Sequence, residues 1–324
     1  ATNGLLARMP GNVVPIALPT PFIVGPVNVF LIKQDPVTLV DTGVGSEESH
    51  AALVRALRQQ GLQISDIEVI LVTHGHVDHI GQLSRLLDES GAHACAHGSV
   101  VPHTHDAIDN EARSREFLLQ TFREFGVPEE IVQLVHKVRD SFKGMSGTPQ
   151  IHKSLKEGDK ILDLGVFHVP GHSSSDTLFV NTVHRFAFTG DHVLKGVNPT
   201  PLIRRDHSTG GRVRSMLEYE LSLARTRALD LEVMYPGHGQ VINSPKEVID
   251  RILLRQERRT RKVHERLKTG PATPHEVSVD LFPELPPEHT FLALSTAIGH
   301  LDLLEHSGAA CARFVDGVYS YSVT

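Results

Sequence analysis

The sequence contains few cysteines and no long apolar stretch. No apolar run approaches the roughly 18 residues needed to span a membrane, so we expect no transmembrane segment. The two cysteines, Cys95 and Cys311, lie far apart in the chain, which indicates no disulfide framework and favours a reducing cytoplasm. Residues 1–10 also lack the basic and apolar regions of a signal peptide.

Positive charge is scarcer than negative charge. With 32 Lys and Arg against 38 Asp and Glu, the formal net charge is −6, which argues against a general nucleic-acid binder. The composition, 40% hydrophobic and 22% charged, is typical of a soluble globular chain, and 324 residues suffice for one large and one small domain. We therefore expect a small-molecule partner rather than nucleic acid or a membrane.

A run of metal-binding side chains follows one apolar segment. Residues 67–72 predict a buried strand, and Gly75 allows a tight turn soon after it. The side chains within this turn that can bind a metal are His74, His76, Asp78 and His79. The first two are two residues apart and project the same way if the chain is extended, whereas the last two are adjacent and point to different places. The spacing therefore predicts two neighbouring metal ions.

The motif THGHVDH at residues 73–79 resembles the signature of the metallo-β-lactamase superfamily of binuclear metallohydrolases. The resemblance implies further ligands downstream, each after an apolar strand and a turn of small residues. Three segments fit this description, and they supply His172, Asp191 and His238. The family also tends to carry an early Asp-Thr-Gly turn, found here at residues 41–43. In the family that aspartate is structural, so we leave Asp41 out of the metal set.

The resemblance also implies how the ligands are shared. The expected ligands of the first ion are His74, His76 and His172, those of the second are Asp78, His79 and His238, and Asp191 bridges the two. Imidazole and carboxylate ligands without thiolate suit two Zn²⁺ ions, although Fe or Mn also fits such a site. Hydroxide generated on the metals would then attack without a protein nucleophile. We expect Asp78, which can orient the hydroxide or move a proton, and Asp191 to be the catalytic residues.

Alternation of strands and helices indicates a layered α/β protein. The resemblance implies an αββα sandwich, although alternation alone also permits a doubly wound sheet. We expect one helix at residues 79–90 and two strands, 159–164 and 166–170, separated at Gly165.

The catalytic domain is expected over residues 1–245, with an inserted helical hairpin over about 102–150. The helices of this hairpin are predicted at residues 108–125 and 129–142. The insertion either packs on the core or forms a lid that shapes the substrate pocket, because long excursions inside compact domains are often functional.

Residues 246–324 are expected to form a separate domain of three helices and a β-hairpin, with the hairpin turn at Asp316 and Gly317. This order is typical of a winged helix, and a similar tail occurs in the lactamase-beta-2-like branch of the family, some of whose members cut single-stranded RNA. Residues 291–301 would be the recognition helix, yet they contain no Lys or Arg. We therefore interpret this helix as a packing or homodimer element.

The form of the first motif is similar to that of hydroxyacylglutathione hydrolases and related thioesterases. A thioester of hydroxyacylglutathione or acyl-CoA type is accordingly the expected substrate. RNA phosphodiesters, lactones and a mononuclear-iron sulfur dioxygenase activity are the alternatives, and the complete second ligand set argues against the last. Arg204 and Arg205 follow Asp191 in a loop, where they either bind an acidic group of the substrate or remain solvated.

Overall fold

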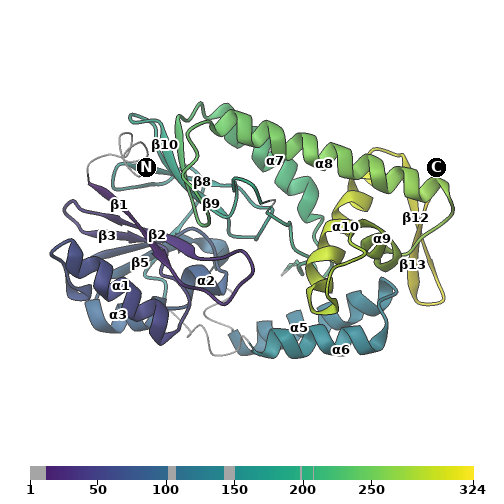
Figure 1. Ribbon diagram of the computed structural model, residues 1–324, viewed down its shortest axis with the longest axis horizontal. Coiled ribbons are helices and arrows are strands. Elements are labelled where there is room, and N and C mark those ends of the chain that lie inside the picture. The colour runs from purple at the N-terminus through teal and green to yellow at the C-terminus, as the bar shows by residue number, and fades with distance from the viewer. Residues whose placement is uncertain (1–11, 101–106, 142–149, 198, 207) are drawn as a thin grey trace. The chain divides into compact units, whose positions relative to one another are not determined.

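The computed structural model describes residues 12–100, 107–141, 150–197, 199–206 and 208–324 (Figure 1). The chain start and both ends of the expected insertion lie outside these ranges. Two compact units are present. Unit 1 comprises residues 1–107, 144–199 and 223–249, and unit 2 comprises residues 108–143, 200–222 and 250–324.

Unit 1 contains two β-sheets. The strands of the first, in spatial order, are β1 (Val13–Leu18), β2 (Val27–Ile32), β3 (Thr38–Val40), β4 (Val69–Val72), β5 (His93–His97) and β6 (Lys153–Leu155). From β3 to β6 neighbouring strands are parallel, so their carboxyl ends meet at one edge. The α-helices that connect β3 to β4 and β4 to β5 are α1 (Glu47–Gln59), α2 (Val77–Ile80) and α3 (Leu83–Ser90).

The second sheet has the order β11 (Val233–Pro236), β10 (Phe186–Gly190), β9 (Thr177–Asn181), β8 (Leu164–His168) and β7 (Lys160–Ile161). The expected break at Gly165 is wrong, because Gly165 lies inside β8 and pairs with Val180 of β9. The chain turns instead after β7, where Leu162 adopts a left-handed backbone with φ of 55°. The expected helix at residues 79–90 is also divided, into α2 and α3.

The side chains of β2 show why the two sheets form layers. Val29 and Leu31 join the apolar cluster that contains α1 and α3, whereas Phe30 and Ile32 join the cluster between the sheets. This alternation follows from the two-residue period of a strand. Phe30 meets Phe188 and Tyr235 of the second sheet, with ring centroids 5.2 and 5.6 Å apart. These layers are those of the expected αββα sandwich.

Unit 2 is mainly helical. It contains α5 (Ala107–Glu124), α6 (Glu129–Ser141), most of α8 (Pro245–Lys268), α9 (Pro274–Leu281), α10 (Thr290–His306) and the strands β12 (Ala310–Val315) and β13 (Val318–Val323). The helix α7 (Ser215–Ala228) has residues in both units. Asp316 and Gly317, both with positive φ, make the β12–β13 turn, as expected. Winged-helix character stays a prediction.

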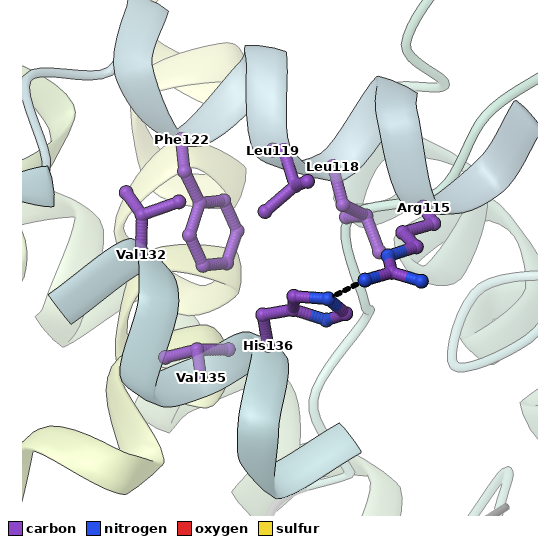
Figure 2. A pocket seen from close by; sticks show the side chains of 7 residues that line it. All are labelled: Arg115, Leu118, Leu119, Phe122, Val132, Val135 and His136. Atoms are coloured by element: carbon purple, nitrogen blue, oxygen red, sulfur yellow. Dashed lines mark hydrogen bonds between the residues drawn. The ribbon is translucent and has the colours of Figure 1, made fainter. Parts of the chain in front are cut away.

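One apolar core joins the insertion to the C-terminal helices. Phe122 of α5 and Val132 of α6 belong to the same cluster as Leu294, Ile298 and Leu301 of α10. The insertion, which we assigned to the catalytic domain, thus groups with the C-terminal segment. Within the insertion, α5 and α6 border a small hollow (Figure 2). It is lined by Leu118, Leu119, Phe122, Val132 and Val135, with Arg115 and His136 at one side.

None of the helices among the described residues is both long and apolar enough to cross a membrane.

Candidate metal centre

Seven side chains of unit 1 gather where several strands end. His74 and His76 follow β4, Asp78 and His79 lie in α2, and the other three follow β8, β10 and β11. They form three overlapping groups whose ligand atoms lie within 4.8 Å of one another. The groups are His74, His76 and His172; His74, His79 and Asp191; and Asp78, His79 and His238. The structure thus brings together all seven side chains that the sequence predicted as ligands.

The first group consists of three histidines. Nδ1 of His76 lies 3.0 Å from Nε2 of His74 and 2.9 Å from Nε2 of His172. Burial and the neighbouring His172 lower the pKa of His76 to about 3, and burial, together with His79, holds the pKa of His74 well below its usual value. Both rings are therefore neutral at pH 7, and a neutral imidazole is the form that binds a metal.

Hydrogen bonds on the outer side of His74 define its tautomer. Oγ1 of Thr73 donates to Oδ2 of Asp41 at 2.7 Å and lies 3.2 Å from Nδ1 of His74. Because its one hydrogen is given to Asp41, the hydroxyl accepts from Nδ1 of His74. Nε2 of His74 consequently presents a lone pair to the centre.

We call the group of Asp78, His79 and His238 the second group, and it is held by comparable contacts. His238 donates through Nδ1 to the carbonyl oxygen of Pro26 at 2.8 Å, and its Nε2 lies 3.2 Å from Oδ2 of Asp78. Nδ1 of His79 donates to Oδ2 of Asp41 at 2.8 Å. Asp41 belongs to none of the metal groups found among the described residues; it orients His79 from outside, as partners of metal-bound histidines commonly do.

The second group also attracts positive charge. Burial by itself lowers the pKa of His79, but Asp41, Asp191 and Asp78 together raise it well above its ordinary value. The same carboxylates favour a bound divalent cation, which would compete with that proton.

Asp191 lies between the two groups. Its Oδ2 is 3.7 Å from Nε2 of His172 and 3.6 Å from Nε2 of His238, and its Oδ1 is 3.5 Å from Nε2 of His79. Although burial opposes ionisation, His79, His238 and His172 hold the pKa of Asp191 well below its usual range. A carboxylate in this position can contact an ion in each group.

Two buried atoms of the centre lack hydrogen-bond partners among the described residues: Nε2 of His79 and Oδ1 of Asp191. They lie 3.5 Å apart, an ion-pair distance at which neither makes a hydrogen bond of good geometry. The donor set therefore fits a bound divalent metal, which would satisfy both atoms.

Glycines of the strand-end turns allow this packing. A Cβ on Gly237 would lie 2.5 Å from Oδ1 of Asp191 and 2.6 Å from Cε1 of His79. A Cβ on Gly190 would lie 2.5 Å from Oγ1 of Thr73, and Gly190 has φ of +46°. Any side chain at these two positions would displace residues that form or support the centre.

The arginines predicted to contact substrate lie in unit 2 and belong to none of the metal groups. Arg204 forms an ion pair with Glu218 of α7, and Arg205 forms an isolated backbone bridge with Arg212. Their role at a substrate stays a prediction. Sequence reasoning assigned no role to Ser175 or Asp176, which contact the turns that carry the ligands; the only local signal was the run of serines after His172.

Comparison with known proteins agrees with this geometry. Residues 23–238 match the model of the Metallo-beta-lactamase superfamily. The chain is 31% identical over 303 residues to the probable metallo-hydrolase YqjP of Bacillus subtilis, covering 91% of this chain and 92% of that protein. It is 24% identical over 218 residues to the hydroxyacylglutathione hydrolase GloC of Haemophilus influenzae, covering 65% of this chain and 85% of that one.

A solved structure extends the likeness in fold to nearly the whole chain. It is that of a metallo-beta-lactamase family protein from Thermus thermophilus, with a TM-score of 0.82 and 24% identity, and the match covers 97% of this chain and 99% of the other. The family match, the relative from Bacillus subtilis and the assembled donor set lead to one conclusion: the chain belongs to the metallo-beta-lactamase superfamily and is a metallo-hydrolase.

Proposed function

We propose that this protein is a two-metal hydrolase that cleaves a thioester in a small molecule of the hydroxyacylglutathione or acyl-CoA type. The observation that carries the two-metal part is the position of Asp191 between two ligand groups, each complete with three further donors. The thioester part is supported by the THGHVDH form of the first motif and by the likeness to a hydroxyacylglutathione hydrolase.

The proposed division of the ligands is the one that the resemblance implies, and two of the three groups of close ligand atoms support it. His74, His76 and His172 would hold one Zn²⁺ ion, Asp78, His79 and His238 would hold the other, and Asp191 would contact both. Bound together, two such ions supply hydroxide at neutral pH and polarise the bond under attack.

The remaining task for the protein is proton movement. Despite burial, His79 lowers the pKa of Asp78 below its ordinary value, so this carboxylate is ionised at neutral pH. In this proposal the Asp78 carboxylate accepts a proton during attack. A thiol has an ordinary pKa of about 8.5 and departs as thiolate without a strong proton donor, so a thioester makes a small demand on these residues.

We propose a small-molecule substrate rather than RNA. The helix that would read nucleic acid in a winged helix is α10, and its residues Leu294, Ala297 and Leu301 are buried in the core of unit 2. Residues 291–301 also lack Lys and Arg.

The test combines metal analysis with a substrate panel. Protein purified without added metal is assayed for zinc, iron and manganese per chain, and then for turnover of hydroxyacylglutathione and acyl-CoA thioesters, lactones and single-stranded RNA. We expect about two zinc ions per chain and thioester turnover that a chelator abolishes. One iron per chain with no hydrolysis would contradict the proposal, as would turnover of RNA or lactones alone.

A further inference from the structure

The loop between β8 and β9 carries His172 and is closed by internal hydrogen bonds. Asp176 accepts at its carboxylate from the backbone N and the hydroxyl of Ser173, at 2.8 and 2.7 Å, and its carbonyl accepts from the backbone N of Val169 at 2.8 Å. These bonds determine the shape of the loop. They do not determine where His172 lies relative to the first motif, which depends on contacts that leave the loop.

Two hydrogen bonds tie the loop and the first residue of β9 to the first motif. The backbone N of Gly75 donates to Oγ of Ser175 at 3.0 Å, and the backbone N of Thr177 donates to the carbonyl of Thr73 at 2.9 Å. Gly75 stands between His74 and His76. This side of the loop is thereby joined to the turn that supplies the other two ligands of the first group.

A further external contact is made at the carbonyl oxygen of Ser174. This oxygen accepts from Nε2 of His168 at 2.8 Å and lies 3.0 Å from Oγ of Ser99. His168 ends β8 in the second sheet, and Ser99 lies directly after β5 of the first sheet. The carbonyl oxygen of Ser174, two residues after His172, thus lies within hydrogen-bond distance of a donor near the end of one strand in each sheet.

His168 is itself held firmly. Its ring stacks on that of His97, with centroids 3.8 Å apart and planes inclined by 10°. Burial and the proximity of His168 lower the pKa of His97 to about 4, so the His97 ring is neutral at pH 7.

The backbone of His168 is bound at both its polar atoms. Its N–H donates to Oε2 of Glu157 at 2.6 Å, and its carbonyl accepts from Arg225 at 3.0 Å. Arg225 in turn donates to Oε1 of Glu157 at 2.7 Å. With ring and backbone both constrained, Nε2 of His168 is a donor of defined position.

We propose that His168 and Ser99 are positioning residues of the metal centre: through the carbonyl of Ser174 they hold the loop so that Nε2 of His172 faces His74 and His76. This inference rests on the proposed function, since it takes His172 as a metal ligand. Neither residue touches the ligand atoms, so each acts through the backbone of the loop.

The two donors contribute unequally. The hydroxyl of Ser99 has one hydrogen and two acceptors within reach, the carbonyl of Ser174 at 3.0 Å and Nδ1 of His97 at 2.7 Å. Nε2 of His168 donates to the carbonyl oxygen of Ser174. Loss of His168 should therefore weaken the loop more than loss of Ser99.

The experiment measures metal affinity of the full chain by competition with a chromophoric chelator, using His168→Ala, His168→Gln, Ser99→Ala and the control His93→Ala. His93 is an exposed residue of β5. We expect His168→Ala to lower the affinity for one of the two ions by about 10-fold or more, as loss of an outer hydrogen-bond partner typically does. The second ion should bind as before, Ser99→Ala should have a smaller effect, and His168→Gln, which retains an N–H donor, should restore most of the affinity.

The outcomes separate the two proposals. Unchanged affinity in His168→Ala, or equal weakening of both ions together with a lower melting temperature, would overturn the positioning role. Failure of His168→Gln to restore affinity would also overturn it. A wild-type chain that binds no metal would overturn the metal centre itself, whereas two bound ions without thioester turnover would overturn only the proposed substrate and leave the positioning role intact.

Discussion

Nε2 of His79 and Oδ1 of Asp191 lie 3.5 Å apart in the interior of unit 1, and both lack a hydrogen-bond partner among the described residues. Asp191 also approaches His172 and His238, one from each ligand group. Replacing Asp191 by Asn removes the charge that both ions would share. We expect metal content to fall by at least one ion per chain, and turnover to fall by more than the roughly 10–100-fold that loss of an outer partner costs.

Elemental analysis and steady-state assays of Asp191→Asn check this prediction, with circular dichroism to confirm that the variant is folded. Two tightly bound ions in the variant would contradict a bridging role.

Gly237 tests the close packing around the same carboxylate. In Gly237→Ala the new methyl group would lie 2.5 Å from Oδ1 of Asp191, so the carboxylate or His79 has to move. We expect a folded protein with clearly weaker metal binding, measured by chelator competition. Gly211→Ala is the matched control, because its Cβ would meet Oγ1 of Thr209 at 3.6 Å, an ordinary contact. Equal affinity in the two variants would show that the centre tolerates the displacement.

Tyr235 carries a hydroxyl that is buried between the sheets and has no hydrogen-bond partner in the part of the chain that the structure describes. Its ring contacts Phe30, Phe186 and Phe188. Because Tyr235→Phe removes an unsatisfied polar group and keeps the ring, the free energy of unfolding should stay the same or rise by up to about 1 kcal/mol. Tyr235→Ala should lower it by about 3–5 kcal/mol. Denaturant titration distinguishes the two, and a large loss in Tyr235→Phe would reveal a partner for the hydroxyl, such as a buried water.

A buried ion pair joins a loop of unit 2 to α10. Arg212 donates to both carboxylate oxygens of Asp302 at 2.6 Å, and the Asp302 side chain is 1% exposed. Asp302→Ala would leave Arg212 without its carboxylate partner, so we expect a loss of about 3–5 kcal/mol in unfolding free energy. The control, Glu257→Ala, removes the exposed pair with Arg261 and should cost less than about 1 kcal/mol. Similar losses for both variants would contradict the assignment.

His300 links stability to pH. This ring lies in α10, fully buried, with Nδ1 2.8 Å from Oγ1 of Thr260; burial and Arg259 lower its pKa to about 3. Below its ordinary pKa of 6.5 the unfolded chain takes up a proton that the folded chain does not, so the contribution of this ring to stability is present at neutral pH. It declines as the pH falls from about 6.5 toward 3.

We therefore expect His300→Gln to reduce the slope of the unfolding free energy against pH between pH 6 and pH 4. The reduction should correspond to about one proton fewer taken up on unfolding. Denaturant titrations at several pH values measure this slope. An unchanged slope would mean that His300 titrates alike in the folded and unfolded chains.

Several features of the fold could be predicted because they depend on short segments. The turn at Asp316 and Gly317 is one, since two adjacent positive-φ residues suit a tight hairpin whatever surrounds them. Gly165 shows the limit of such reasoning. A glycine suggests a break, yet here pairing with Val180 keeps it in the strand, and Leu162 takes the left-handed conformation instead.

The insertion shows the same limit at a larger scale. Its helices were expected from the helical character of the segment and the break at residues 126–128, and both are present. The residues that bury their apolar faces could not be predicted. An apolar face on a helix predicts that it will be buried, but it does not identify the segment that packs against it. In the structure, residues of α10 share that core.

The sequence by itself determined the family and the candidate ligands, because each ligand follows an apolar strand and a small-residue turn, and such signals are local. Only the tertiary structure decided how these residues act together. It placed Asp191 between two groups, put Asp41 behind His79, and joined the His172 loop to both sheets through the carbonyl of Ser174. Some of these relationships connect residues far apart in the chain, such as Ser99 and Ser174, which are 75 positions apart. They depend on how the strands pair and the sheets pack, which no short stretch of sequence specifies.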